Sequence, residues 1–371
     1  MLRLRAIVWT HTMPRKKPRN WPAFSRKVIA NMEDSESKKG PPVSKLQLSV
    51  AIGDYDRMRP LVDGRVQMDG VDAQIMLLEP EEIFFRAFRH ADFDICELSL
   101  SSYSVKTAAG TSPYVAVPVF PSRAFRHTSI YVRTDRIKSP ADLRGRRVGV
   151  PEYQLTANIW VRLFLEEDYG IRPSDITWVR GGYEHPGRVE KINLNLPADV
   201  VVENARPDVT ISDLLANGEL DAVIGPRAPS CFEQGHPNVG YLFADPQATA
   251  TDWYRRTRLF PIMHTLGIRR SLVEKHPWLP VAVFKAFERS KAIAIAKLAD
   301  TSATKVTLPF VEEQLRAART LMGEDFWAYG LEPNRHVLTR FLQRHHAEGL
   351  SVRLLAPEEL FHPASLELHK I

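Results

Sequence analysis

The sequence has few cysteines and no long apolar segment. Its only cysteines, Cys96 and Cys231, are too few for a disulfide framework and lack the spacing of a metal site. The first apolar run, residues 6–9, is shorter than the core of about 7–15 residues that a secretory signal needs. No run approaches the roughly 20 apolar residues of a membrane-spanning helix. These absences favour a cytoplasmic protein with no membrane partner.

Positive charge is concentrated at the N-terminus. Residues 1–45 contain 11 Lys and Arg against three acids, a net charge of +8, whereas the rest carries 39 against 41, a net charge of −2. A basic tail can bind nucleic acid or anionic lipid. This segment is rich in Pro, Lys and Ser and has no hydrophobic period, so a disordered or non-native leader is favoured and no nucleic-acid partner is expected.

Segments of strand and helix character alternate through the chain. Runs of β-branched and apolar residues that end in Gly, Pro or polar clusters predict strands. These runs are residues 46–52, 65–78, 93–98, 115–119, 129–132, 146–150, 176–179 and 221–224. Helices are expected to begin near Pro80 and after Thr210. The C-terminus is expected to be rich in amphipathic helices, over residues 281–299, 309–322 and 335–346.

This alternation predicts an α/β fold with parallel sheets. We expect two α/β lobes around a hinged cleft, because hinge closure around a ligand is common in such proteins. Lobe 1 is expected to comprise residues 46–134 plus 262–371, with the helix-rich C-terminus, and lobe 2 to comprise residues 135–261.

The clearest binding feature is the turn that follows the predicted strand 146–150. The polar residues Glu152, Gln154 and Thr156 come next, before an apolar helical segment that ends near Gly170. Free N–H groups at a helix N-terminus bind anions, and ligands of open α/β sheets bind outside the carboxyl ends of strands. We therefore expect these side chains to line the cleft.

Five segments carry motifs that occur together in one known family. They read GDYDR with RPL (residues 53–61), FFRAF (84–88), ELSLSSY (97–103), GVPEYQLTA (149–157) and GPRAP (225–229). In this order they resemble the 4,5-dihydroxyphthalate decarboxylases, from about Ser44 to the C-terminus. The resemblance implies a periplasmic-binding-protein-like type II fold in a cytoplasmic protein. Because such relatives begin near Ser44, residues 1–43 are expected to be an over-extended gene prediction.

The resemblance also implies a reaction, the non-oxidative decarboxylation of 4,5-dihydroxyphthalate to protocatechuate and CO2. An aryl carboxylate leaves poorly because the departing electrons lie outside the π-system. Protonation of the ring carbon that bears the carboxylate solves this, and a deprotonated para hydroxyl favours that protonation. The site therefore needs an acid over the ring carbon, a base near the catechol oxygens and cations for the retained carboxylate. Each acid–base step contributes about 10²–10⁴-fold.

His264, His127 and Glu97 are the expected catalytic residues. Histidine carries protons near neutral pH. His127 precedes the predicted strand 129–132, and His264 precedes a strand that is expected to return to the first lobe, so both are expected near the hinge. A structural histidine at a crossover is the alternative for each. Glu97, at a strand end, is costly to bury unless it is paired or functional, so we expect it to act as the phenol base or to orient a histidine. His345 and His346 are expected on the surface of a C-terminal helix.

Four arginines are candidates for binding the substrate carboxylates, since a guanidinium fits a carboxylate with two hydrogen bonds. They are Arg57, Arg59, Arg126 and Arg227. A surface or interlobe salt bridge is the alternative for each. The sequence has no His-x-His, His-x-x-x-His or Cys-x-x-Cys motif, so no metal is expected, and no other cofactor is expected either. The alternative is a metal held by two histidines and a carboxylate that converge in space.

Polar residues after two predicted strands are candidates for the remaining substrate contacts. Those that could bond the catechol are Ser99, Ser101, Gln154 and Thr156. Glu152 is a further candidate, although an acid at a helix start is often a partner of the helix dipole, and we favour that alternative.

Three competing functions remain at this point. The first is a non-catalytic solute-binding protein for a small aromatic carboxylate, because fold does not fix function. The second is a decarboxylase of a related aromatic acid. The third is a nucleic-acid binder whose salt-sensitive affinity would depend on residues 1–43. The small aromatic dicarboxylate is the expected partner, and homo-oligomer formation is left open.

Overall fold

The computed structural model describes most of the chain. The described residues are 44–188, 192, 194 and 196–368. Lys45–Ile371 forms one compact unit. The expectations for residues 1–43 lie outside the described residues. No helix of the described part is long and apolar enough to cross a membrane.

The first sheet has five strands in the order β2-β1-β3-β11-β4. They are β1 (Leu46–Ile52), β2 (Val71–Leu77), β3 (Ile95–Ser99), β4 (Tyr114–Val117) and β11 (His264–Arg269). β1 runs parallel to β2 and β3, whereas β11 runs antiparallel to β3 and β4. The carboxyl ends of β1 and β3 therefore meet the first residue of β11 at one edge of the sheet.

The second sheet has six strands in the order β10-β5-β9-β6-β7-β8. They are β5 (Ile130–Arg133), β6 (Arg147–Val150), β7 (Thr177–Arg180), β8 (Val201–Asn204), β9 (Ala222–Ile224) and β10 (Val239–Tyr241). β9, β6, β7 and β8 are parallel, and β5 is antiparallel to β9 and β10.

These sheets confirm the two α/β lobes, but both sheets are mixed, so the expectation of parallel sheets is wrong. The expected boundary at residue 134 would also leave β5 in the first lobe, whereas β5 pairs only within the second sheet. The reason is physical. Composition and alternation indicate a strand, but its direction and neighbours depend on residues that are distant in the sequence.

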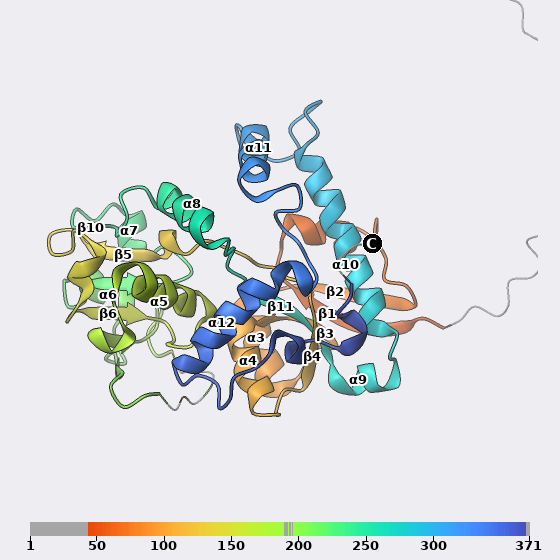
Figure 1. The fold of residues 1–371 in the computed structure, drawn as a ribbon, viewed down its shortest axis with the longest axis horizontal. Helices are drawn as coiled ribbons and strands as arrows, with labels where there is room; N and C mark the ends of the chain where they lie inside the picture. The colour runs from red at the N-terminus through yellow and green to blue at the C-terminus, as the bar shows by residue number, and fades with distance from the viewer. Residues whose placement is uncertain (1–43, 189–191, 193, 195, 369–371) are drawn as a thin grey trace, which may run out of the picture. The chain divides into compact units, whose positions relative to one another are not determined.

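Helices pack on both sheets (Figure 1). The α-helices are α2 (Arg59–Val62), α3 (Pro80–His90), α4 (Leu100–Ala108), α5 (Thr156–Tyr169), α6 (Ile211–Ala216), α7 (Ser230–Glu233), α8 (Pro246–Thr257), α9 (Arg270–Lys275), α10 (Leu279–Leu298), α11 (Val311–Met322) and α12 (Arg335–Ala347). The 3₁₀ helices are η2 (Asp56–Met58), η3 (His127–Ser129), η4 (Pro140–Leu143), η5 (Pro173–Asp175), η6 (Glu332–Asn334), η7 (Pro357–Leu360) and η8 (Pro363–Ser365). α3 and α4 contact β3, and α6 contacts β6 and β9.

Local signals explain where several of these helices begin and end. Pro80 opens α3 with Glu81 and Glu82 in its first turn, where acids favour the helix dipole. Thr210 caps α6 through a hydrogen bond from the Asp213 backbone. α5 ends at Gly170, whose φ of +65° suits glycine.

The C-terminal helix α12 packs against α5 of the second lobe. The rings of Trp160 and Phe341 lie 5.4 Å apart between centroids, and Arg162 forms a buried ion pair of 2.6 Å with Glu348, just after α12. His345 of this helix is fully buried, so its expected surface position is wrong. The amphipathic period showed one apolar face, but α12 is covered on more than one side.

Candidate active site

A carboxylate–histidine pair lies at the edge of the first sheet. His264 is the first residue of β11 and pairs with Ser99 of β3, so its side chain is on the same face as that of Glu97, two residues earlier on β3. Nδ1 of His264 lies 2.5 Å from Oε1 of Glu97. The structure therefore brings together two of the three residues that the sequence predicts to be catalytic.

The Glu97 carboxylate is fully buried and accepts two further hydrogen bonds. The Gly53 backbone N–H donates to Oε2 over 2.9 Å, and the Tyr55 hydroxyl donates to Oε1 over 2.8 Å. Burial, the largest influence, favours the neutral acid, but the charge and hydrogen bond of His264 together with these donors hold the pKa of Glu97 below its usual value. Glu97 is thus an anion at neutral pH.

The loop after β1 fixes Tyr55 and Arg57 beside the pair. A Cβ at Gly53 would lie 2.6 Å from the Tyr55 ring, so only glycine leaves room for this ring. The guanidinium of Arg57 lies over the rings of Tyr55 and Trp327, 4.3 and 4.4 Å from their centroids. Its Nε donates to the Pro121 carbonyl over 2.6 Å. The Arg57 cation is therefore held in a defined place next to the pair.

The second ring nitrogen of His264 is available for chemistry. Because the Glu97 carboxylate accepts at Nδ1, that nitrogen carries a proton. Nε2 has no hydrogen-bond partner among the residues that the structure describes. The side chain is 16% exposed, and the Phe84 ring contacts the imidazole edge-on at 4.8 Å between centroids. Nε2 can therefore give a proton to a bound ligand or take one from it.

Arg126 is a second cation, which contacts the residue before His264. It lies in the crossover between the sheets, and its Nε donates to Sδ of Met263, the residue before His264, over 3.1 Å. In the described part of the chain, no carboxylate forms an ion pair with it. Burial lowers the pKa of Arg126 to about 10, which leaves it charged at neutral pH. A thioether is a weak acceptor, so this guanidinium can bind a ligand carboxylate.

Four candidate residues for substrate binding meet where the N-termini of α4 and α5 face each other. Oγ of Ser99 lies 3.1 Å from Oγ1 of Thr156, which also accepts from the Ser101 backbone N–H over 3.1 Å. Oε1 of Gln154 accepts from Ser101 over 3.4 Å and from Ser102 over 3.1 Å. These contacts join the two lobes, and all five side chains are buried.

Glu152 is buried beside this cluster and contacts an arginine that the sequence did not indicate. The Gln154 amide donates to Oε2 of Glu152 over 3.1 Å. An Arg188 nitrogen lies 2.5 Å from Oε1 of Glu152 and 2.5 Å from Glu81 at the start of α3. Arg188 and Arg227 line a cavity of about 610 Å³ between the lobes. Glu152 thus belongs to an interlobe ionic network.

Two of the candidate arginines lie in exposed ion pairs. Arg59 pairs with Asp54 and is 51% exposed, and Arg227 pairs with Glu79 and is 74% exposed. Exposed pairs of this kind contribute only about 0–1 kcal/mol. Both positions fit the salt-bridge alternative. Arg57 also pairs with an acid, Asp56, over 3.2 Å, but it is only 15% exposed and lies over the Tyr55 ring.

His127 lies apart from the pair in an aromatic cluster. Its ring is stacked on Phe164 at 4.2 Å and contacts Phe243 and Trp253. Neither ring nitrogen has a hydrogen-bond partner in the described part of the chain. Burial lowers the pKa of His127 to about 4, so the ring is neutral at pH 7. This setting fits the structural alternative better than the expected role in proton transfer.

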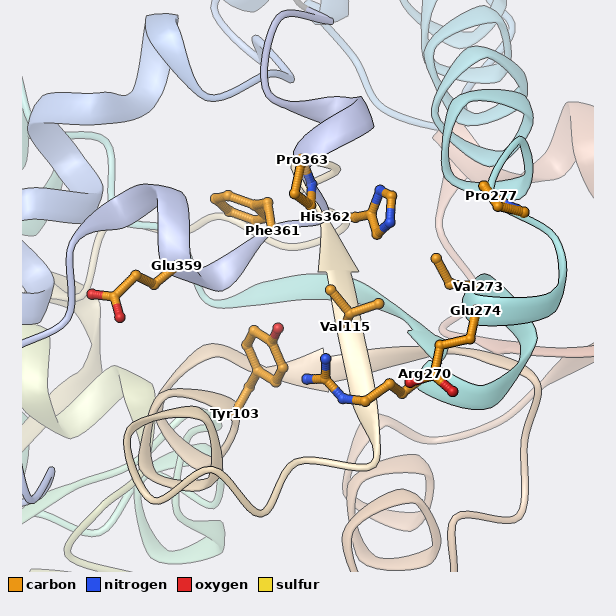
Figure 2. A pocket seen from close by; sticks show the side chains of 10 residues that line it. All are labelled: Tyr103, Val115, Arg270, Val273, Glu274, Pro277, Glu359, Phe361, His362 and Pro363. Atoms are coloured by element: carbon orange, nitrogen blue, oxygen red, sulfur yellow. The ribbon is translucent and has the colours of Figure 1, made fainter.

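Among the described residues, no group of three or more His, Cys, Asp or Glu is arranged to hold a metal ion, and the expected metal-free reaction stays a prediction. A separate cavity of about 380 Å³ is lined by residues of β4, α9 and the C-terminal segment, including Arg270 and His362 (Figure 2). None of the site residues expected from the sequence lines it.

Sequence similarity to known proteins identifies the family of this chain. No protein-family model matches the chain. The 4,5-dihydroxyphthalate decarboxylase of Comamonas testosteroni is 72% identical over 330 residues, which cover 89% of this chain and 100% of that protein. The chain belongs to the 4,5-dihydroxyphthalate decarboxylase family. The expected family is thus confirmed.

A second relative and a solved structure are also similar to this chain. The 4,5-dihydroxyphthalate decarboxylase of Pseudomonas putida is 75% identical over 214 residues, which cover 57% of this chain and 83% of that protein. A solved structure, the alkanesulfonate-binding protein of Xanthomonas axonopodis pv. citri, is 13% identical with a TM-score of 0.49, and covers 86% of this chain and 99% of that chain.

The sequence did not assign Tyr55, Arg188 or His345 to this neighbourhood. Tyr55 lies inside the GDYDR motif, so the motif itself was a signal that could have identified it. Arg188 carries no such signal, because its two carboxylate partners lie 36 and 107 residues away in the sequence. His345 was predicted to lie on the surface only because of the amphipathic pattern of its helix.

Proposed function

We propose that this protein is a carboxy-lyase that converts 4,5-dihydroxyphthalate to protocatechuate and CO2. The observation that carries the proposal is the 72% identity to a 4,5-dihydroxyphthalate decarboxylase over the whole length of that protein. The buried Glu97–His264 pair supports it, because ring protonation needs a positioned proton carrier with one free nitrogen.

His264 is the general acid in this proposal. Its imidazolium gives the Nε2 proton to the ring carbon that bears the departing carboxylate. The electrons of the breaking C–C bond then restore the aromatic ring, and CO2 leaves. Glu97 balances the positive charge and holds the ring of His264, as the buried acid does in other carboxylate–histidine pairs. Because the Glu97 carboxylate bonds to His264, Tyr55 and Gly53, we assign it the role of orienting the histidine and not that of phenol base.

The remaining residues bind and orient the substrate. Arg126 contacts Met263, the residue before His264, and Arg57 lies over the ring of Tyr55, so we assign both to the carboxylates. The hydroxyl and amide groups at the N-termini of α4 and α5 bind the catechol, and Glu152 supports them through Gln154. His127 is left out of the proton transfer because aromatic rings enclose it.

Incubation of the purified protein with 4,5-dihydroxyphthalate tests the proposal. Wild-type protein should release CO2 and protocatechuate, and His264→Ala should lower kcat by at least about 10²-fold while the Kd for substrate changes little. His90→Ala, an exposed histidine at the end of α3, is the matched control. Binding without turnover by the wild type would favour a solute-binding protein, and near-normal kcat in His264→Ala would refute the proton transfer.

We also propose a cytoplasmic location and no nucleic-acid partner. Both cysteines are free and buried, in keeping with a reducing compartment. Fractionation of the native host tests the location. Light scattering of the purified protein tests whether it forms a homo-oligomer.

A further inference from the structure

We infer that His345 is a positioning residue for the substrate-binding side chains at the N-termini of α4 and α5, and that it acts through Ser101 and Gln154. The inference rests on the proposed function. α12 carries His345 to the N-terminus of α4, where its Nε2 lies 3.1 Å from Oγ of Ser101. The side chain is fully buried. A C-terminal residue thus contacts the buried polar cluster at the N-termini of α4 and α5 directly.

The direction of each hydrogen bond follows from the Glu152 carboxylate. An ionised carboxylate only accepts, so the Gln154 NH2 group points to Glu152 and its carbonyl oxygen points to the serines. The Ser101 hydroxyl then donates to Gln154, which leaves its oxygen to accept from His345. A proton on Nε2 of His345 completes this chain of hydrogen bonds, and it avoids a buried N–H on Nδ1 that would have no acceptor among the described residues.

The buried setting keeps His345 in this neutral form. Burial lowers the pKa of His345 to about 4, and the neighbouring Glu348 opposes that effect only in part. Nδ1 has no hydrogen-bond partner among the described residues, as expected for a neutral ring protonated on Nε2. At neutral pH, His345 therefore acts as a fixed hydrogen-bond donor and takes no part in proton transfer.

α12 is anchored on the second lobe, which fixes this donor in place. Glu348 accepts from Arg162 of α5 over 2.6 Å and from Arg344 of α12 over 2.6 Å. Ser101 belongs to the first lobe and contacts Thr156 of the second. The His345–Ser101 hydrogen bond therefore ties the C-terminal helix to the buried side chains through which the two lobes contact each other.

Two substitutions of His345 separate positioning from bulk structure. His345→Gln keeps an N–H donor near the Nε2 position, whereas His345→Leu removes it at similar size. Loss of one hydrogen bond predicts a rise in KM and in substrate Kd of about 3- to 10-fold for His345→Leu. The kcat should stay within about twofold, since the Glu97–His264 pair does not contact His345. His345→Gln should restore both constants, and His346→Ala, which loses only a bond to the Ser351 carbonyl, should change neither.

A double-mutant cycle tests the route through Ser101. In a Ser101→Ala background, His345→Leu should have no further effect on KM or Kd, because the shared hydrogen bond is already absent. Additive effects, an unchanged KM in His345→Leu, or a His345→Gln variant as impaired as His345→Leu would each overturn the inference. If His345→Leu does not fold, His345→Asn, whose amide is too short to reach Ser101, replaces it. If the wild type binds without turnover, the proposed function fails, and the Kd comparison still decides the role of His345.

Discussion

Replacing Glu97 by glutamine changes the charge of the buried pair and almost nothing of its shape. The carboxylate accepts from Gly53, Tyr55 and His264 at once. If the glutamine carbonyl accepts from Gly53, its NH2 group faces the Tyr55 hydroxyl and Nδ1 of His264. The glutamine NH2 group and the Nδ1–H of His264 are both donors, so neutral His264 must carry its proton on Nε2 instead. The imidazolium form of His264 also loses its negatively charged partner.

The size of the effect follows from these contacts. A hydrogen bond to a charged group contributes about 1.5–3 kcal/mol, which corresponds to about 10- to 150-fold in rate. General acid–base catalysis as a whole contributes about 10²–10⁴-fold, which sets the upper limit. We therefore expect kcat to fall by about 10- to 150-fold in Glu97→Gln, with little change in KM because Arg126 and Arg57 remain.

Steady-state formation of protocatechuate measures the loss. Asp94→Asn is the matched control, because this partly buried carboxylate precedes β3 and bonds to Ser49 without contacting His264. Glu97→Gln combined with His264→Ala should be no slower than His264→Ala alone, since the two residues act as a unit. A folded Glu97→Gln protein with kcat within about threefold of wild type would refute the assigned proton transfer.

The same substitution should alter the pH dependence of stability. The pKa of Glu97 is lower in the folded protein than its usual value. Its contribution to stability is therefore present above the unfolded pKa of about 4.3 and is lost as pH falls through the folded pKa. Urea unfolding at pH 7 and in mild acid should show a smaller acid-induced loss in Glu97→Gln than in wild type. An equal loss in both proteins would contradict the ionised state assigned to Glu97.

Three other substitutions test the arginine assigned to a substrate carboxylate, the glycine beside Tyr55 and the buried ion pair next to α12. Arg126→Met should raise KM by about 10- to 150-fold with kcat largely kept, because one charge-assisted bond to the substrate is lost; an unchanged KM would rule out this carboxylate contact. Gly53→Ala should lower kcat and have a smaller effect on KM, because the new Cβ would displace the Tyr55 ring, whose hydroxyl donates to Glu97. An unaltered kcat would show that Tyr55 is not needed there. Glu348→Gln should destabilise the protein by about 3–5 kcal/mol in urea unfolding, because it leaves Arg162 buried without its carboxylate, whereas Asp252→Asn in an exposed pair should have no measurable effect.

Local patterns were sufficient for most strands and several helices. The alternating run at residues 46–52 coincides with β1, and the predicted segments at 146–150 and 335–346 match β6 and α12 to within one residue at either end. α4 was missed because its first turns are rich in serine, which competes for backbone hydrogen bonds and favours turns. Short-range signals of this kind determine elements, but they do not determine which elements meet.

The sequence by itself determined the family and the residue types available for proton transfer and anion binding. Glu97, His264 and Arg126 could be named because their chemistry is apparent from residue type and motif. Their arrangement was decided only in three dimensions. β11 returns antiparallel beside β3 and brings together Glu97 and His264, which are 167 residues apart in the chain. His345 is buried for the same reason, because a helical period shows which face is apolar but not what covers the other faces.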